Sequence, residues 1–108
     1  MAGAAILVLT QLPDLASAQA LARALVEARL AACVSVGASV ESLYHWRGQI
    51  ETATEVPVVV KTRAACYAEI EAAIRARHPY ELPEILAVPV LDGFAPYLDW
   101  LAAETRDH

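Results

Sequence analysis

The alternation of apolar and polar residues predicts a strand followed by a helix at the start of the chain. The run AAILVLT (4–10) is continuously apolar and precedes a proline, a pattern typical of a buried central strand. Pro13 and Asp14 then offer a turn and an N-cap. Over 15–32 apolar residues recur at helical spacing and charged side chains fall on the other side, which predicts a helix that covers one face of a sheet.

The middle of the chain predicts a long hairpin. Over 33–46 one parity is largely apolar and the other largely polar, which is strand alternation, with Gly37 as a candidate bulge. The sequence RGQ (47–49) predicts the turn, and 50–62 returns as the paired strand. Because proline cannot donate a ladder hydrogen bond, Pro57 indicates an edge on that side of the strand.

The second half of the chain predicts a helix, a strand and a short closing helix. Thr62 is a candidate N-cap for a helix over 64–77. His78 should end this helix, because the residue before a proline is pushed out of the helical region. The rest of the chain is expected to form a strand over 84–91 and a helix over 95–105.

This order of elements, β-α-β-β-α-β plus a C-terminal helix, predicts a single α+β domain (1–108) of the ferredoxin-like class. Two helices should cover one face of an antiparallel sheet. Hairpin strands of fourteen residues would reach roughly 45 Å, whereas a compact chain of this size is about 34 Å across. The hairpin should therefore project as an arm. An exposed ribbon carrying Tyr44, Trp46 and Ile50 invites aggregation, so we expect these residues to pack against another subunit.

Composition narrows the classes of function. Hydrophobic residues make up 57% of the 108 positions, more than a domain of this size hides easily, which again favours a subunit interface. The formal net charge is −5 and the 8 basic residues are scattered, which argues against nucleic-acid binding. No apolar segment reaches the length of a membrane span. Two cysteines without pair spacing suit a reducing, cytoplasmic compartment.

Four motifs resemble one known family. ARLAACV (28–34), SLYHWRGQIETATEVPVVVKT (42–62), HPYELPEILAVPV (78–90) and YLDWL (97–101) stand in the order and spacing of the CutA divalent-cation-tolerance proteins. The resemblance runs through nearly the whole chain. It implies a ferredoxin-like subunit in a tight homotrimer, similar in plan to the nitrogen-regulatory signalling proteins. It also implies tolerance of copper and other divalent ions, and no enzymatic activity.

The candidate metal ligands are Cys33, His78, Glu81 and Glu84. Cysteine is a soft ligand for Cu(I), imidazole binds copper and zinc, and two glutamates three residues apart could add oxygen ligands. The alternatives are a packed cysteine and a histidine that only ends a helix, unless a trimer brings these residues into one cleft. Family members with a proposed metal site carry a cysteine near position 10 and a second histidine beside His78. Thr10 and Arg77 stand there in this chain, which predicts weaker binding.

Two functions follow. The first is a cytoplasmic homotrimer that binds copper or other divalent ions weakly in clefts between subunits and takes part in metal tolerance. The second is a trimeric signalling or scaffold module that binds a small molecule in those clefts. In that case Trp46, Lys61 and Tyr80 would line the site and metal would be incidental. No nucleophile constellation or phosphate-binding loop supports an enzyme.

Overall fold

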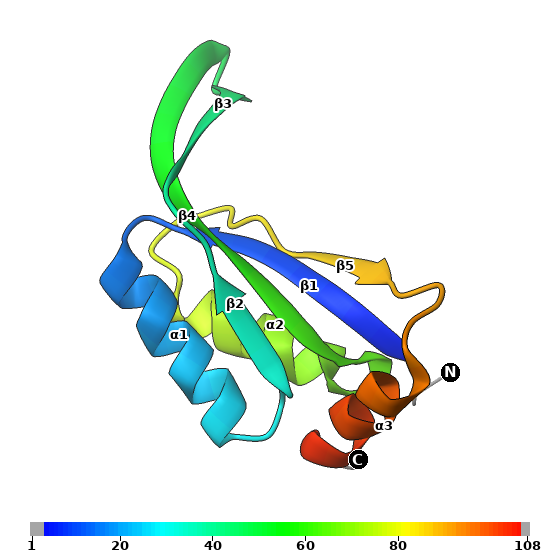
Figure 1. The fold of residues 1–108 in the computed structure, drawn as a ribbon. Coiled ribbons are helices and arrows are strands. Elements are labelled where there is room, and N and C mark those ends of the chain that lie inside the picture. The colour runs from blue at the N-terminus through cyan, green and yellow to red at the C-terminus, as the bar shows by residue number, and fades with distance from the viewer. Residues whose placement is uncertain (1–3, 107–108) are drawn as a thin grey trace.

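The computed structural model describes residues 4–106 and arranges them as one antiparallel sheet with its helices mainly on one side (Figure 1). The elements are β1 (Ala5–Leu12), α1 (Leu15–Glu27), β2 (Cys33–Val36), β3 (Val40–Trp46), β4 (Gln49–Arg63), the 3₁₀ turn η1 (Ala64–Cys66), α2 (Tyr67–Arg77), β5 (Leu86–Pro89) and α3 (Ala95–Glu104). The strand order is β2-β4-β1-β5, and β3 pairs with the outer half of β4. The predicted ferredoxin-like α+β architecture is confirmed.

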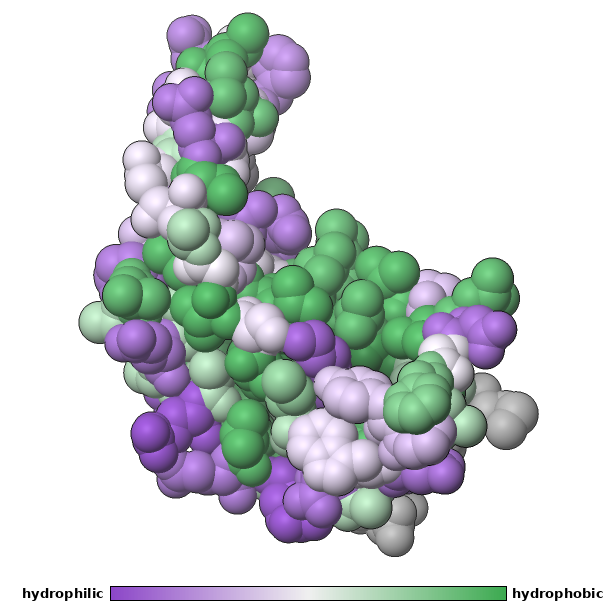
Figure 2. Space-filling view, in the orientation of Figure 1, coloured by the Kyte–Doolittle hydropathy of each residue, from purple (hydrophilic) through white to green (hydrophobic). Residues whose placement is uncertain are grey.

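The sheet has one covered face and one open face. Side chains along β1 alternate between buried and half-buried, because every second residue points to the core under α1 and α2. The core is built from Val8, Leu12, Leu21, Leu25, Val58, Val60, Ile70 and Ile74, among others. We call the opposite side the open face, and its apolar residues by strand register are Leu7, Leu9, Val59, Leu86 and Val88. Figure 2 shows this apolar surface over β1 and β5.

The two helix-boundary predictions at Asp14 and His78 are confirmed. Asp14 is the N-cap of α1, and its side-chain oxygen accepts a hydrogen bond from the Ser17 backbone N–H at 2.7 Å. His78 ends α2 in an extended conformation before proline. The first helix is shorter than the predicted 15–32, since Arg29 adopts a positive φ of 57° and turns the chain toward β2.

The predicted N-cap at Thr62 is wrong. Strand β4 continues through Arg63, and a 3₁₀ turn separates it from α2. Thr62 is fully buried on the covered face, where its hydroxyl donates a hydrogen bond to the Leu30 carbonyl at 2.6 Å. The last strand is also shorter than the predicted 84–91, because only Leu86–Pro89 pairs with β1.

The predicted strand over 33–46 is interrupted after Val36. The backbone N–H of Gly37 donates to the Pro57 carbonyl at 2.9 Å, and pairing with β4 resumes only at Val40. A Cβ atom on Gly37 would stand 3.0 Å from the Pro57 ring, so glycine permits this close approach. Pro57 therefore faces a gap in the ladder, as its missing N–H predicts.

The hairpin turn has two residues rather than the predicted three. Arg47 and Gly48 both have positive φ, 50° and 79°, as in a type I′ turn, and Trp46 pairs directly with Gln49. Beyond the body of the sheet, β3 and the outer half of β4 form a curved two-stranded ribbon (Figure 1). The molecule measures 44 × 26 × 23 Å, so the predicted projecting arm is confirmed.

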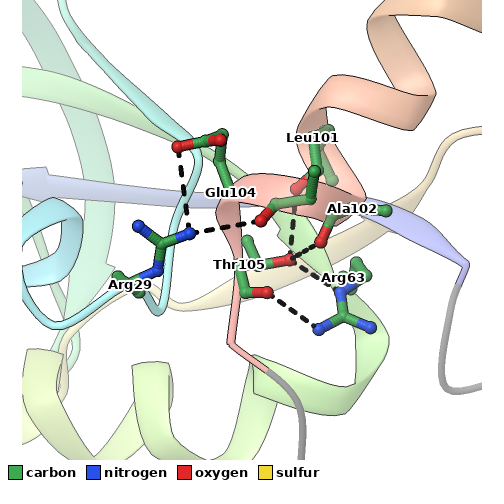
Figure 3. Close-up of polar contacts among 7 residues, drawn as sticks. Arg29, Arg63, Leu101, Ala102, Glu104 and Thr105 are labelled. Atoms are coloured by element: carbon green, nitrogen blue, oxygen red, sulfur yellow. Dashed lines mark hydrogen bonds and ion pairs between the residues drawn. The ribbon is translucent and has the colours of Figure 1, made fainter.

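The C-terminal segment is tied to the body by polar contacts, of which those of Arg63 with Thr105 are buried (Figure 3). The Arg63 guanidinium donates to the Thr105 hydroxyl at 2.6 Å and to the Thr105 carbonyl at 3.2 Å. Arg29 donates to the Ala103 carbonyl at 3.2 Å and lies near the Glu104 carboxylate. These contacts hold α3 against the ends of the strands. None of the described helices is long and apolar enough to cross a membrane.

Candidate functional site

A cavity of 890 Å³ lies between the projecting hairpin and the loop that follows α2. One wall consists of residues 42–47 with Glu55 of β4, and the other is the loop 80–84. We call this cavity the hairpin pocket. Its volume lies within the range of small-molecule sites, and its chemistry is set by three aromatic rings and three carboxylates: Tyr44, Trp46, Tyr80, Glu55, Glu81 and Glu84.

His78 holds the pocket loop against the sheet. Its Nε2 lies 2.5 Å from the Gln11 carbonyl of β1, and its Nδ1 accepts a hydrogen bond from the Tyr80 backbone N–H at 3.2 Å. An Nδ1 that accepts carries no proton, so Nε2 is the protonated nitrogen that donates to Gln11. The ring also packs on Tyr80, with centroids 4.6 Å apart. Both ring nitrogens are thus engaged, and the buried imidazole orients Tyr80 rather than offering a free lone pair.

Tyr80 is the polar centre of the pocket. Burial, followed by the effect of the Glu55 carboxylate that accepts its hydrogen bond, raises the pKa of Tyr80 above the ordinary value of 10.0. Tyr44 adds to the same effect, which means that its hydroxyl is close by. Tyr80 of the loop therefore lies close to both Glu55 of β4 and Tyr44 of β3.

The hairpin turn places a cation at the outer end of the pocket. Arg47 lies with its guanidinium carbon 5.4 Å from the centroid of the Trp46 ring, and its Nη2 is 3.2 Å from a carboxylate oxygen of Glu81. Both members of this ion pair are largely exposed, so it contributes little to stability. It does show that the pocket presents an aromatic face and a carboxylate to the same cationic group.

Two of the predicted site residues lie elsewhere. Cys33 and Lys61 pair across β2 and β4, and the Lys61 Nζ lies 3.8 Å from the Cys33 sulfur and 2.5 Å from the Ser35 hydroxyl. Lys61 also pairs with Leu7 of β1. His78 contacts Gln11 of the same strand, four residues further along the chain. Trp46 and Tyr80 line the hairpin pocket within one chain, whereas Lys61 is not part of its lining, and the ligand cleft between subunits stays a prediction.

The four predicted metal ligands do not gather within one subunit. The described residues contain no group of three or more His, Cys, Asp or Glu side chains that could hold a metal ion. Glu81 and Glu84 are exposed at the hairpin pocket, whereas the His78 ring is buried and hydrogen-bonded. Thr10, at the position where a cysteine would be needed, is buried in the core. A soft copper site built from Cys33 and His78 of one chain therefore does not fit.

Sequence reasoning missed Glu55 and Arg47 as pocket residues. Glu55 pairs with Val40, which places it on the same face of the hairpin as Tyr44 and Trp46. A two-residue turn at Arg47-Gly48 is the signal that fixes this register.

Comparison with known proteins agrees with this fold throughout. The sequence model of the CutA1 divalent ion tolerance protein family matches residues 6–104. The chain is 40% identical over 98 residues to the divalent-cation tolerance protein CutA of Thermus thermophilus, which covers 91% of this chain and 95% of that protein. It is also 40% identical over 102 residues to the protein of the same name from Pectobacterium atrosepticum, covering 94% and 93% of the two chains.

Solved structures lead to the same family. The divalent cation tolerance protein CutA1 of Thermus thermophilus superposes with a TM-score of 0.92 at 38% identity, over 94% of this chain and 99% of that one. CutA1 from the psychrotrophic bacterium Shewanella sp. SIB1 gives 0.93 at 43% identity, over 95% and 96%. From strand order to C-terminal helix, the chain belongs to the CutA1 family of divalent ion tolerance proteins.

Proposed function

We propose that the chain assembles into a homotrimer that acts in divalent-cation tolerance. The observation that carries this proposal is the open face. The central strand β1 presents Leu7 and Leu9 on this face, and the edge strand β5 adds Leu86 and Val88. The Leu86 side chain is 54% exposed. A continuous apolar face of this kind on a small acidic domain is typical of a subunit interface.

The hairpin supports self-association independently. Its outer part has only two strands, and Leu43 and Ile50 near its tip are 65% and 70% exposed. A two-stranded ribbon is marginally stable alone, and its unpaired edges favour pairing with another chain. A neighbouring copy that extends this ribbon and covers the open face would satisfy both features. Tyr44, Trp46 and Ile50 then remain the proposed interface residues. Ile50 lies on the face of the hairpin opposite Tyr44 and Trp46, and these two would adjoin the neighbouring copy at the border of the pocket.

Weak metal binding is the second part of the proposal. Because one chain does not supply three ligands among its described residues, an ion would bind where two subunits meet. Glu81 and Glu84 are the exposed carboxylates available for it. Cys33 and His78 would take part only across such a boundary, since each already contacts other groups of its own chain. Two carboxylate ligands favour a modest affinity for the metal ion.

Two measurements test these proposals. Light scattering on the purified chain should give three times the 11.6 kDa subunit mass, and a monodisperse monomer would refute the assembly. Titration calorimetry with copper and zinc should give weak binding that falls in the double variant Glu81→Gln/Glu84→Gln. The same affinity in that variant and in the wild type would remove the two glutamates as ligands.

The cellular setting follows the same reasoning. Both cysteines are free, Cys66 buried and Cys33 half-buried, which suits a reducing cytoplasm. We place the protein there as a binding protein rather than an enzyme, in keeping with relatives named for cation tolerance. A second candidate function, small-molecule binding, is favoured by the hairpin pocket itself.

A further inference from the structure

We infer that the hairpin pocket binds an aliphatic organic cation, specifically a linear diamine or a longer polyamine. This goes beyond metal tolerance, because the ligand is an extended organic cation rather than a metal ion, although the pocket shares Glu81 and Glu84 with the proposed metal site. Three properties of the pocket carry it: the aromatic faces, the excess of carboxylates and the position of Arg47.

Aromatic side chains line the pocket from both walls. Tyr44 and Trp46 come from β3, and Tyr80 comes from the loop after α2, where His78 fixes its backbone. The faces of such rings attract alkylammonium groups, with tryptophan the strongest, and their apolar surface suits the methylene chain between two ammonium groups.

The charge of the lining favours a cation. The pocket lining contains three carboxylates, those of Glu55, Glu81 and Glu84, against one guanidinium, that of Arg47, and the whole chain is acidic. Glu55 lies at the base of the hairpin beside the Tyr80 hydroxyl, whereas Glu81 lies at the outer end beside Arg47. Carboxylates therefore stand at both ends of the cavity, an arrangement that matches the two charged ends of a diamine.

Arg47 already makes the contacts that the ligand would make. Its guanidinium carbon is 5.4 Å from the Trp46 ring centroid and its Nη2 is 3.2 Å from Glu81. Because this pair is exposed, it is exchanged at little cost. A ligand ammonium would take this place, and Arg47 would swing out to solvent.

The geometry disfavours a metal ion as the occupant. The described residues form no group of three ligating side chains, so the pocket carboxylates of one chain do not by themselves make a complete metal site. A volume of 890 Å³ is also many times larger than an ion with its ligands requires. An extended molecule can bridge separated carboxylates across such a cavity.

The test is titration calorimetry at low salt on the metal-free full chain, with 1,4-diaminobutane and spermidine as cationic probes and 1,4-butanediol as the neutral one. We expect saturable binding of both amines and none of the diol. Glu55→Gln and Trp46→Leu should each weaken amine binding about tenfold. Glu27→Gln, which removes an exposed carboxylate of α1, should leave it unchanged.

The Arg47→Ala variant distinguishes a specific pocket from a merely acidic surface by the size of its effect on amine binding. Removal of the competing guanidinium should strengthen amine binding about threefold, whereas an anionic ligand would bind more weakly. Equal losses in Glu55→Gln and Glu27→Gln, absence of saturation, or weaker binding in Arg47→Ala would each overturn the inference. So would a trimer in which a neighbouring copy fills the pocket. Circular dichroism confirms that each variant is folded, and the Trp46 and Glu55 variants test the outer end and the base of the hairpin wall independently.

Discussion

Thr10 and Thr62 occupy the covered face of adjacent strands, and both are fully buried. The Thr62 hydroxyl donates to the Leu30 carbonyl at 2.6 Å, whereas the Thr10 hydroxyl has no hydrogen-bond partner among the described residues. Thr10→Val should therefore stabilise the fold by about 1 kcal/mol, because an unsatisfied buried hydroxyl is removed. Thr62→Val should destabilise it by about 1–2 kcal/mol, because it leaves the Leu30 carbonyl unpaired. Urea unfolding of both variants measures this, and shifts of the same sign would contradict it.

Tyr80 predicts a loss of stability at high pH. Burial and the Glu55 carboxylate raise its pKa above 10.0, so the folded protein holds the phenolic proton more tightly than the unfolded chain. Its contribution is complete below about pH 10 and is lost as the pH rises through the raised pKa. Tyr80→Phe should therefore lose less stability between about pH 9 and pH 11 than the wild type. Thermal unfolding at both values checks this. Ultraviolet titration should show Tyr80 ionising at lower pH in Glu55→Gln.

At the scale of elements, local patterns predicted the helices and strands better than their junctions. Alternation and capping located β1, the start of α1 and the end of α2. The turn length was the main error. A three-residue turn would set Trp46 against Ile50, but the two-residue turn sets it against Gln49 and brings Glu55 to the pocket side. A shift of one residue moves every side chain to the other face, so an error in one turn hides half of a site.

The role of His78 shows the second limit of local reasoning. Its sequence neighbours indicate both a helix stop and a metal ligand. The choice between them depends on the Gln11 carbonyl, which lies 67 positions away along the chain. No local pattern carries that information, since the contact arises only when β1 and the loop after α2 meet. Trp46, Tyr80 and Glu81 line one pocket within the chain, whereas the predicted cleft between subunits stays a prediction.

The interruption between β2 and β3 makes a prediction at the same scale. Gly37→Ala would place a Cβ atom 3.0 Å from the Pro57 ring, so the ring must give way by a few tenths of an ångström. We expect a loss of about 1–2 kcal/mol in unfolding free energy. In a Pro57→Ala background the ring is absent, and the same glycine change should cost clearly less. Urea unfolding of the four proteins gives this coupling, and additive effects would show that the ring is not the obstacle.

At the scale of the whole molecule, exposed apolar residues gather on the open face, on the hairpin and along the segment from Leu91 into α3. The core under α1 and α2 uses much of the hydrophobic content, and the remainder lies on surfaces that no described helix covers fully. The composition predicted this surplus, but only the sheet topology locates it. The order β2-β4-β1-β5 puts both central strands behind one layer of helices and leaves their other side open.

A matched pair of substitutions tests whether that face is an interface. Leu86, on the open face, and Leu15, at the start of α1, are 54% and 52% exposed in the single chain. Replacement of either by lysine should therefore cost the isolated subunit little. In a trimer, Leu86→Lys would bury a charge in an apolar contact and should lower the assembly to monomers at micromolar concentration, whereas Leu15→Lys should stay trimeric. Light scattering with circular dichroism separates loss of assembly from loss of folding. Equal masses for the two folded variants would mean that the open face carries no contact between copies.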